Sequence, residues 1–272
     1  MSTAAARATS MDPRDVCARA RARLESLART PSDHPASGGY GTRLRRLGLR
    51  GSELDAAARD TRRECRALDA RAVLRVAREL AEGGTFEAGL LAFLLLERHR
   101  PAAESLGARG LERLAHDPDN WVTADSFACL LSGPAWRRGQ VSDARIRAWA
   151  RSRSRWWRRI ALVSTVPLNL PSRGGTGDLP RTLRICALLA ADRDDMVVKG
   201  MSWALREAAK RDPDTVRAFL ARHEGVLAAR VLREVRNKLE TGRKNPRPNP
   251  GRRGAGRGER ATSAVLRRRS AR

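Results

Sequence analysis

Apolar residues recur along most of the chain every three or four positions, the spacing of amphipathic helices, and no segment shows the alternation of a strand. Prolines and capping residues near helix starts and glycines after helix ends place the boundaries. The segment 85–98 is the most apolar and is expected to be a central helix. Helices are predicted from 12 to 29, from 52 onward, and over 69–82, 85–98, 101–116, 120–131, 142–151, 154–166, 179–191, 194–211, 213–223 and 226–241.

The order and length of these segments indicate how the chain is organised. Short helices in antiparallel pairs of about 35–45 residues predict an all-α, HEAT-like α-solenoid with a concave basic surface. The repeats are degenerate, which leaves an irregular helical bundle as the alternative. The Pro- and Gly-rich segments 30–41 and 167–177 are expected to be loops. We expect an N-terminal helix and loop over 1–41, the repeat domain over 42–241 and a disordered basic tail over 242–272.

The charge of the chain points to a polyanionic partner. The formal net charge is +25, and the segment 242–272 contributes eleven basic residues and one acid, which leaves +15 on the rest. Arginines crowd the middle of the chain, where the only acids between residues 120 and 177 are Asp125 and Asp143. Such a basic surface is typical of proteins that bind the phosphate backbone of DNA.

Several classes of site are not indicated by the sequence. The four cysteines and four histidines are scattered, so a structural zinc site is not expected, and the cysteines are expected to be buried free thiols. The longest apolar run, Leu90–Leu96, is too short to span a bilayer. We therefore expect a monomer without metal or cofactor, located in the bacterial cytoplasm and associated with the nucleoid when bound to DNA.

Three side chains leave the apolar stripe of their helix. Trp121 and Asp125 are four residues apart and share a face that points away from the stripe of their own helix. Trp203 lies about 144° from the stripe of the segment 194–211, on its basic side. The bland alternatives are a tryptophan packed under a neighbouring repeat and an aspartate paired with a nearby arginine. Four further tryptophans are expected in packing roles: Trp136, Trp149, Trp156 and Trp157.

Three motifs carry a resemblance to a known family. The segments Asn120–Ser126 (NWVTADS), Trp156–Leu162 (WWRRIAL) and Lys199–Glu207 (KGMSWALRE) resemble, in order and spacing, those of the AlkD-type DNA alkylation repair glycosylases. The resemblance spans about Arg43 to Leu239. It implies HEAT-like repeats and the removal of cationic N3- and N7-alkylated purines from duplex DNA. It also implies lesion recognition along the DNA backbone, without the base flipping common to damage glycosylases.

The resemblance assigns roles to individual residues. The two aromatic wall positions fall on Trp121 and Trp203, the catalytic carboxylate on Asp125 and the backbone-contacting arginine on Arg159. The neighbouring Arg158 is the alternative for that arginine, and Arg159 could instead be one more solvated charge. Additional phosphate contacts are expected from the basic residues near these positions: Arg155, Arg158, Lys199, Arg206 and Lys210.

The chemistry of these residue types agrees with that assignment. Loss of an alkylated purine leaves a sugar cation, which a fixed carboxylate stabilises, and indole faces attract cationic groups. The sequence therefore predicts a monofunctional, metal-free DNA glycosylase acting on alkylated purines in duplex DNA. Two alternatives remain open at this point. One is a non-catalytic DNA-binding HEAT-repeat protein for damaged or branched DNA, since the family includes members without detectable excision, and the other is a HEAT-type protein-interaction scaffold.

Overall fold

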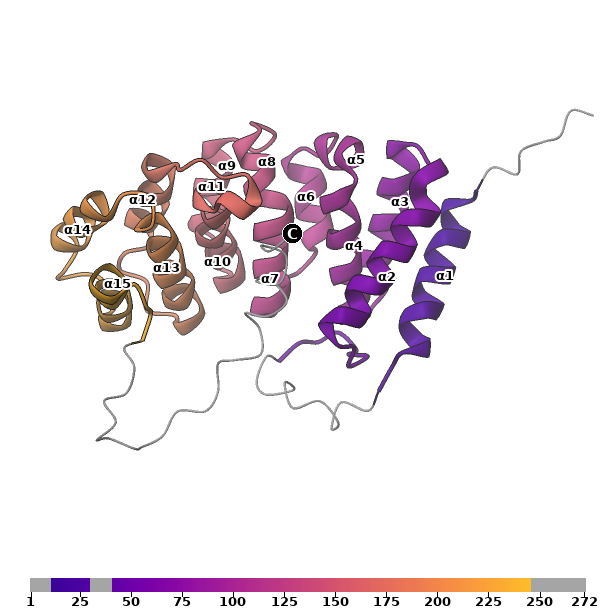
Figure 1. Cartoon of the computed structure of the whole chain (residues 1–272), viewed down its shortest axis with the longest axis horizontal. Coiled ribbons are helices and arrows are strands. Elements are labelled where there is room, and N and C mark those ends of the chain that lie inside the picture. The colour runs from indigo at the N-terminus through magenta and orange to yellow at the C-terminus, as the bar shows by residue number, and fades with distance from the viewer. Residues whose placement is uncertain (1–10, 30–40, 246–272) are drawn as a thin grey trace, which may run out of the picture. The chain divides into compact units, whose positions relative to one another are not determined.

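The computed structural model describes residues 11–29 and 41–245, and these residues fold as helices joined mostly by short turns (Figure 1). Within them the only strand-like pairing is one isolated bridge between Arg45 and Thr85. The described residues form two compact units, 11–29 with 43–105 and 41–42 with 106–245. Almost all of the predicted loop 30–41 and of the predicted tail 242–272 lies outside the described residues. The domain boundaries expected from the sequence stay a prediction.

The first unit is built around α4, whose neighbours are α2 and α3. Ten of its 13 residues are buried, which confirms the central helix predicted from its apolar sequence. The buried carboxylate of Glu87 on α4 accepts hydrogen bonds from the backbone N–H groups of Leu47 and Gly48, both at 2.9 Å. The helices of this unit are α1 (Pro13–Ser26), α2 (Gly51–Glu64), α3 (Ala70–Ala81), α4 (Phe86–Arg98) and α5 (Arg100–Glu104).

Helix starts in the first unit follow local capping chemistry, with one correction. Asp12 and Asp69 accept hydrogen bonds from the first turns of α1 and α3, as their sequence positions predict. The helix predicted from residue 52 onward begins one residue earlier, at Gly51, with Arg50 as its N-cap. The carboxylate that closes the start of α2 belongs to Glu53, which accepts the N–H of Arg50 at 2.7 Å. Glu53 also binds Arg29, and the hydrogen bond from Arg29 is the main reason that its pKa is lowered to about 2.

The second unit holds every candidate site residue. Helices α9 and α10 pack together, as do α12 and α13, and α10 lies between α7 and α13 (Figure 1). The helices of this unit are α6 (Ala108–Ala115), α7 (Trp121–Phe127), α8 (Gly133–Arg137), α9 (Asp143–Ala150), α10 (Arg155–Val163), α11 (Val166–Asn169), α12 (Leu179–Leu188), α13 (Asp195–Ala208), α14 (Pro213–Arg222) and α15 (Ala229–Thr241).

The helix predicted over 120–131 is longer and less regular than expected. α7 continues into a π-helical turn, Ala128–Ser132, and then into α8. Proline in a helix removes a backbone donor and crowds the preceding turn, and the wider turn before Pro134 accommodates it. Gly133 is needed here, because a Cβ at this position would lie 2.6 Å from the carbonyl oxygen of Ser164.

Two other segments differ from the prediction. The helix expected over 101–116 is broken into α5 and α6 around Gly107, which precedes α6 in an extended conformation. The loop expected over 167–177 contains most of α11 and a 3-10 turn, Pro171–Arg173. Arginine side chains hold this segment through its carbonyl groups: Arg137 donates to Pro167, and Arg211 donates to Asn169 and Gly175.

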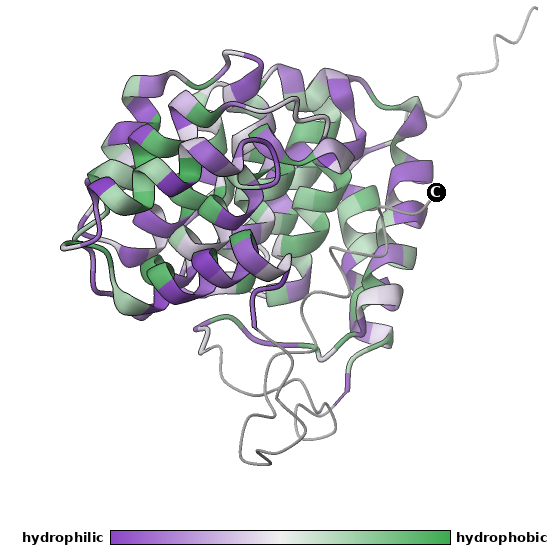
Figure 2. Ribbon diagram, turned by 60° about the vertical axis from the view of Figure 1, so that its left-hand side comes forward, coloured by the Kyte–Doolittle hydropathy of each residue, from purple (hydrophilic) through white to green (hydrophobic). Residues whose placement is uncertain are grey.

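Most helices carry hydrophobic and hydrophilic residues on different sides (Figure 2). Consecutive helices pack in pairs, which confirms the predicted all-α, solenoid-like fold class. The curvature of the predicted concave surface stays a prediction. In residues 11–29 and 41–245, no helix is both long enough and apolar enough to cross a membrane.

Candidate functional site

Asp125 and Arg159 form an ion pair that joins α7 to α10. Arg159 Nε donates to Asp125 Oδ1 and Arg159 Nη2 donates to Asp125 Oδ2, both at 2.7 Å. The third nitrogen, Nη1, donates to the backbone carbonyl of Met196 in the first turn of α13. A planar guanidinium matches the two oxygens of a carboxylate, so this pairing fixes the orientation of both groups. Three helices are therefore linked through one arginine.

The burial of this pair overturns an expectation from the sequence. Asp125 was predicted on a face turned away from the core, and Arg159 was considered as a solvated charge, but each residue is only 5% exposed. The reason is that α7 has α10 as a neighbour on its polar side. An apolar stripe reports one packed side of a helix only. A second side of the helix can also pack against a neighbour and bury ion pairs. Because its residues are charged, this side is not recognised from the pattern of apolar residues in the sequence.

Helix α13 contributes a second face to the site. Met196, Gly200 and Trp203 follow each other at spacings of four and three residues, so they lie on one side of this helix. Gly200 faces Arg159, because a Cβ at Gly200 would lie 3.4 Å from Arg159 Cγ. Trp203 is half-buried, two helical turns beyond the carbonyl that Arg159 binds. The indole thus lies on the side of α13 that faces the ion pair.

Trp121 reaches the same region from α7. It begins this helix, one turn before Asp125 and on the same face, and it is half-buried. The buried side chain of Asn120 caps the helix by accepting the N–H of Thr123 at 3.0 Å. The structure therefore gathers Trp121, Asp125, Arg159 and Trp203 on the three adjacent helices α7, α10 and α13, with the charged pair buried and the two indoles partly exposed.

The other tryptophans are mostly packing residues, as predicted. Trp136 and Trp149 are buried. The ring of Trp157 stands 5.1 Å from that of Trp149 and 6.2 Å from that of Phe127. Phe127 is the last residue of α7, so these rings pack α7 and α9 against α10. Trp156 is half-buried, and its packing role stays a prediction.

The basic residues expected to bind phosphate all have partners within the protein. Acids of the turn between α12 and α13 fold back onto α10: Asp192 binds Arg158 at 2.7 Å and Asp194 binds Arg155 at 3.3 Å. The residues on α13 are paired locally, Lys199 with Asp195, Lys210 with Glu207, and Arg206 with the backbone and hydroxyl of Ser202. The ion pair with Lys199 lowers the pKa of Asp195.

The sequence analysis did not predict these ion pairs, because the three aspartates at 192, 194 and 195 lie beyond the segment 120–177, in which Asp125 and Asp143 are the only acids. These aspartates, close in sequence to the arginine-rich segment, were the feature from which the ion pairs with α10 could have been predicted. Since Arg158 and Arg159 are both engaged inside the protein, their phosphate contacts stay a prediction, and so do those of the other basic residues named above.

Thiol chemistry is not supported in this region. All four cysteines are free and buried, and burial raises the pKa of Cys129 near the site and raises that of Cys186 to about 12. A protonated, buried thiol is a poor nucleophile. Among residues 11–29 and 41–245, no group of three or more His, Cys, Asp or Glu side chains has an arrangement that could hold a metal ion.

Comparison with known proteins places this architecture. A solved structure described as a predicted DNA alkylation repair enzyme from Enterococcus faecalis matches with a TM-score of 0.57 and 14% identity, over 84% of this chain and 96% of that one. At this identity the match shows a shared fold. No curated protein matches the chain. The model of the DNA alkylation repair enzyme family matches residues 20–239, which include all four site residues. The chain therefore belongs to the DNA alkylation repair enzyme family.

Proposed function

We propose that this protein is a monofunctional DNA glycosylase that removes cationic N3- or N7-alkylated purines from duplex DNA, with Asp125 as its catalytic residue. The observation that carries the proposal is the carboxylate of Asp125, held by two hydrogen bonds from Arg159, one helical turn from Trp121. Membership of a DNA alkylation repair enzyme family supports alkylated DNA as the substrate.

The reaction needs stabilisation of positive charge at the sugar. The bond between C1′ and the purine nitrogen breaks with its electron pair going to the base, which leaves neutral, while the sugar becomes a cation. Water then adds to C1′ and loses a proton, which gives an abasic site. A carboxylate placed beside C1′ stabilises the cation without itself forming a bond.

Arg159 is a positioning residue in this proposal. Its guanidinium occupies one edge of the carboxylate and keeps both oxygens in a fixed plane, so the group needs no reorganisation when charge develops. Seven per cent of each side chain remains accessible, which places the pair at the edge of the packed region. An ion pair held in this way keeps the carboxylate of Asp125 in one orientation and limits its movement.

The half-buried indoles suit a cationic lesion. Trp121 and Trp203 lie on the helices either side of α10, each on the face directed toward the ion pair. A cationic purine held against an indole face is stabilised by about 0.5–2 kcal/mol, depending on how much water is excluded. Neutral purines lack this contribution, so the two rings favour alkylated bases over normal ones.

One rival function is supported by the same ion pair. In a DNA-binding protein without excision, the Asp125–Arg159 pair would serve only to join α7 to α10 and α13. Such a protein would bind damaged or branched DNA and release no base. The two functions predict different results for a variant that keeps the shape of Asp125 but removes its charge.

The test is single-turnover excision from methylated duplex DNA at saturating protein, scored as released methylpurine and heat-labile abasic sites. Wild-type protein is expected to release N3- or N7-methylpurine with or without EDTA. Asp125→Asn is expected to reduce the rate by about 10²-fold or more, the scale for loss of one electrostatic stabiliser, while DNA binding holds.

The matched control is Asp212→Asn, which removes one negative charge from the same unit. Asp212 caps α14 by accepting the N–H of Thr215, and asparagine caps a helix equally well. This control should excise at the wild-type rate. DNA binding without release of any methylpurine by the wild type would select the rival function. An equal loss of binding and excision in Asp125→Asn would make Asp125 a structural residue.

A further inference from the structure

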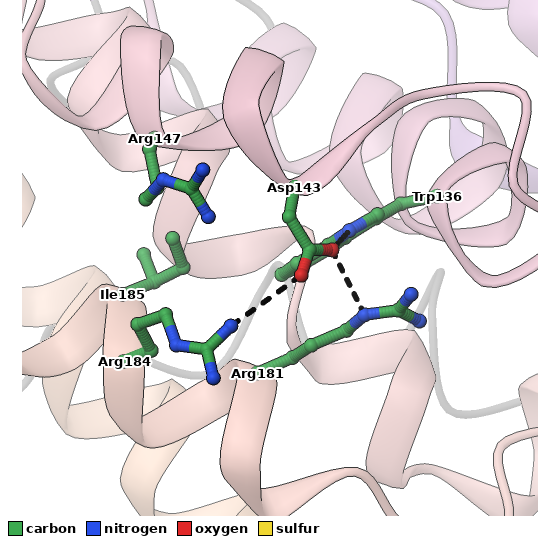
Figure 3. Close-up of a pocket in the computed structure, with 6 residues that line it drawn as sticks. All are labelled: Trp136, Asp143, Arg147, Arg181, Arg184 and Ile185. Atoms are coloured by element: carbon green, nitrogen blue, oxygen red, sulfur yellow. Dashed lines mark hydrogen bonds and ion pairs between the residues drawn. The ribbon is translucent and has the colours of Figure 1, made fainter.

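A shallow surface pocket, too small to enclose a cavity, lies between α8, α9 and α12 (Figure 3). It is lined by Trp136 of α8, by residues of α9 and by residues of α12. None of these residues belongs to the candidate site, which is built on α7, α10 and α13. The lining residues are Trp136, Asp143, Arg147, Arg181, Arg184 and Ile185.

The pocket has a net positive charge of two, because three arginines surround one carboxylate. Asp143 Oδ1 accepts hydrogen bonds from Trp136 Nε1 at 2.7 Å and from Arg181 Nε at 3.0 Å. These donors, Trp136 first, lower the pKa of Asp143. The guanidinium of Arg181 lies on one side of this carboxylate, while the side chains of Arg147 and Arg184 lie on the other (Figure 3).

Arg147 and Arg184 are the least engaged of these groups. Arg147 is half-buried, and its side chain has no hydrogen bond or ion pair within the part of the chain that the structure describes. Arg184 reaches Asp143 only through one contact of 3.4 Å. Both guanidinium groups therefore have donors available for a further acceptor. A half-buried arginine without a partner has lost part of its hydration. The oxygens of an incoming anion would accept the hydrogen bonds that water no longer accepts.

The charge continues along α9. Arg151 is one turn beyond Arg147 on the same face, is exposed, and makes no ion pair with another described residue. Asp143 is the only acid that lines the pocket. The surface thus offers several arginine donors on two adjacent helices with one acid among them, a charge balance that favours a polyanion.

We infer that the face formed by Arg147 and Arg184, on α9 and α12, binds a backbone phosphate of DNA at a place separate from the candidate excision site. A guanidinium binds phosphate oxygens through paired N–H donors, and two of them can clamp one phosphate. Such a contact adds affinity without reading sequence or damage. This inference rests on the charge and geometry of the pocket and does not depend on base excision.

The experiment measures binding of the full chain to an undamaged duplex oligonucleotide as a function of salt. For Arg147→Gln/Arg184→Gln, the slope of log K against log salt should become shallower by about one to two units, as expected for the loss of one or two phosphate contacts. Single-turnover excision at saturating protein should stay at the wild-type level if the protein is a glycosylase. Because the DNA is undamaged, failure of the proposed enzymatic function leaves this result unaffected.

The matched control is Arg222→Gln/Arg233→Gln, which removes two exposed charges on α14 and α15. Neither arginine makes an ion pair among the residues that the structure describes. The slope of this control should stay within half a unit of wild type. Equal changes in the two double variants would overturn the inference, because they would show only the effect of bulk charge. Circular dichroism should give the same melting temperature for both.

A second arm distinguishes the DNA backbone from free phosphate. Melting temperatures are compared in sodium phosphate and in sodium chloride at equal ionic strength. The inference is supported if Arg147→Gln/Arg184→Gln changes the DNA salt slope, whether or not phosphate raises the melting temperature of the wild type. Stabilisation by phosphate that is lost in this variant, together with an unchanged DNA salt slope, would assign the pocket to a free phosphate and overturn the DNA contact.

Discussion

Two aspartates of the second unit bind arginines from neighbouring helices, and they differ mainly in how much water reaches them. The side chain of Asp125 is 7% exposed and receives both of its hydrogen bonds from Arg159. The side chain of Asp143 is 33% exposed and shares donors from Trp136, Arg181 and Arg184. One carboxylate depends on a single partner, and the other has three.

The difference in exposure and in number of partners gives the two carboxylates different properties. A buried carboxylate with one partner is held in a single orientation, and loss of that partner leaves a charge without compensation. A carboxylate with several partners near water tolerates the loss of one, because solvent and the remaining donors replace it. The first arrangement suits a fixed electrostatic stabiliser, and the second suits a surface whose arginines can change partners.

The largest expected effect is on stability. Arg159→Ala should lower the free energy of unfolding by about 3–5 kcal/mol, because it leaves Asp125 charged, buried and unpaired. Arg181→Ala should cost about 1 kcal/mol or less, since Asp143 keeps Trp136, Arg184 and water. Urea denaturation followed by circular dichroism measures both. Similar losses in the two variants would remove the distinction between the pairs.

Removing both charges of the buried pair separates folding from catalysis. The double variant Asp125→Asn/Arg159→Gln should regain most of the stability lost in Arg159→Ala, because no unpaired charge remains. Its excision rate should still be lower than that of the wild type by about 10²-fold, as the stabilising anion is absent. Thermal unfolding measures the stability of each variant, and single-turnover assays measure its excision rate. Recovery of both would show that Asp125 acts only through the fold.

The stability contributed by Asp143 and its partners should depend on pH. The folded-state pKa of Asp143 lies below its ordinary value of 3.8, so its contribution to stability is present above that pH and is lost as the pH falls through the folded pKa. The difference in melting temperature between wild type and Asp143→Asn should be constant at about pH 6 and narrow near pH 3. A difference that widens in acid would contradict the lowered pKa.

The smallest effect concerns how tightly α13 approaches the buried pair. At Gly200 a Cβ would lie 3.4 Å from Arg159 Cγ, an ordinary contact, so Gly200→Ala should raise the stability of the helix by about 0.5–1 kcal/mol. Gly133→Ala is the contrasting variant, because its Cβ would lie 2.6 Å from a carbonyl oxygen and should destabilise the protein. A loss at Gly200 would mean that the ion pair requires closer packing than we infer.

Much of the fold follows from local sequence. The apolar run in Phe86–Arg98 marks the central helix of the first unit, and aspartates such as Asp12 and Asp69 mark helix starts. These features depend on neighbours within one or two helical turns, which the sequence displays directly. The π-helical turn before Pro134 is different, because its geometry also depends on the close approach of Gly133 to Ser164 on another segment.

The candidate site also combines features that depend on local sequence with features that depend on tertiary contacts. The sequence alone determined which residues we propose for the chemistry, since the spacing of Trp121, Asp125 and Trp203 and the surrounding motifs are local. Only the tertiary structure decided that Asp125 is buried against Arg159, 34 residues away, and that the arginines at the start of α10 meet the acids that follow α12. Ion pairing depends on which helices become neighbours, and helical periodicity carries no information about the partner's charge.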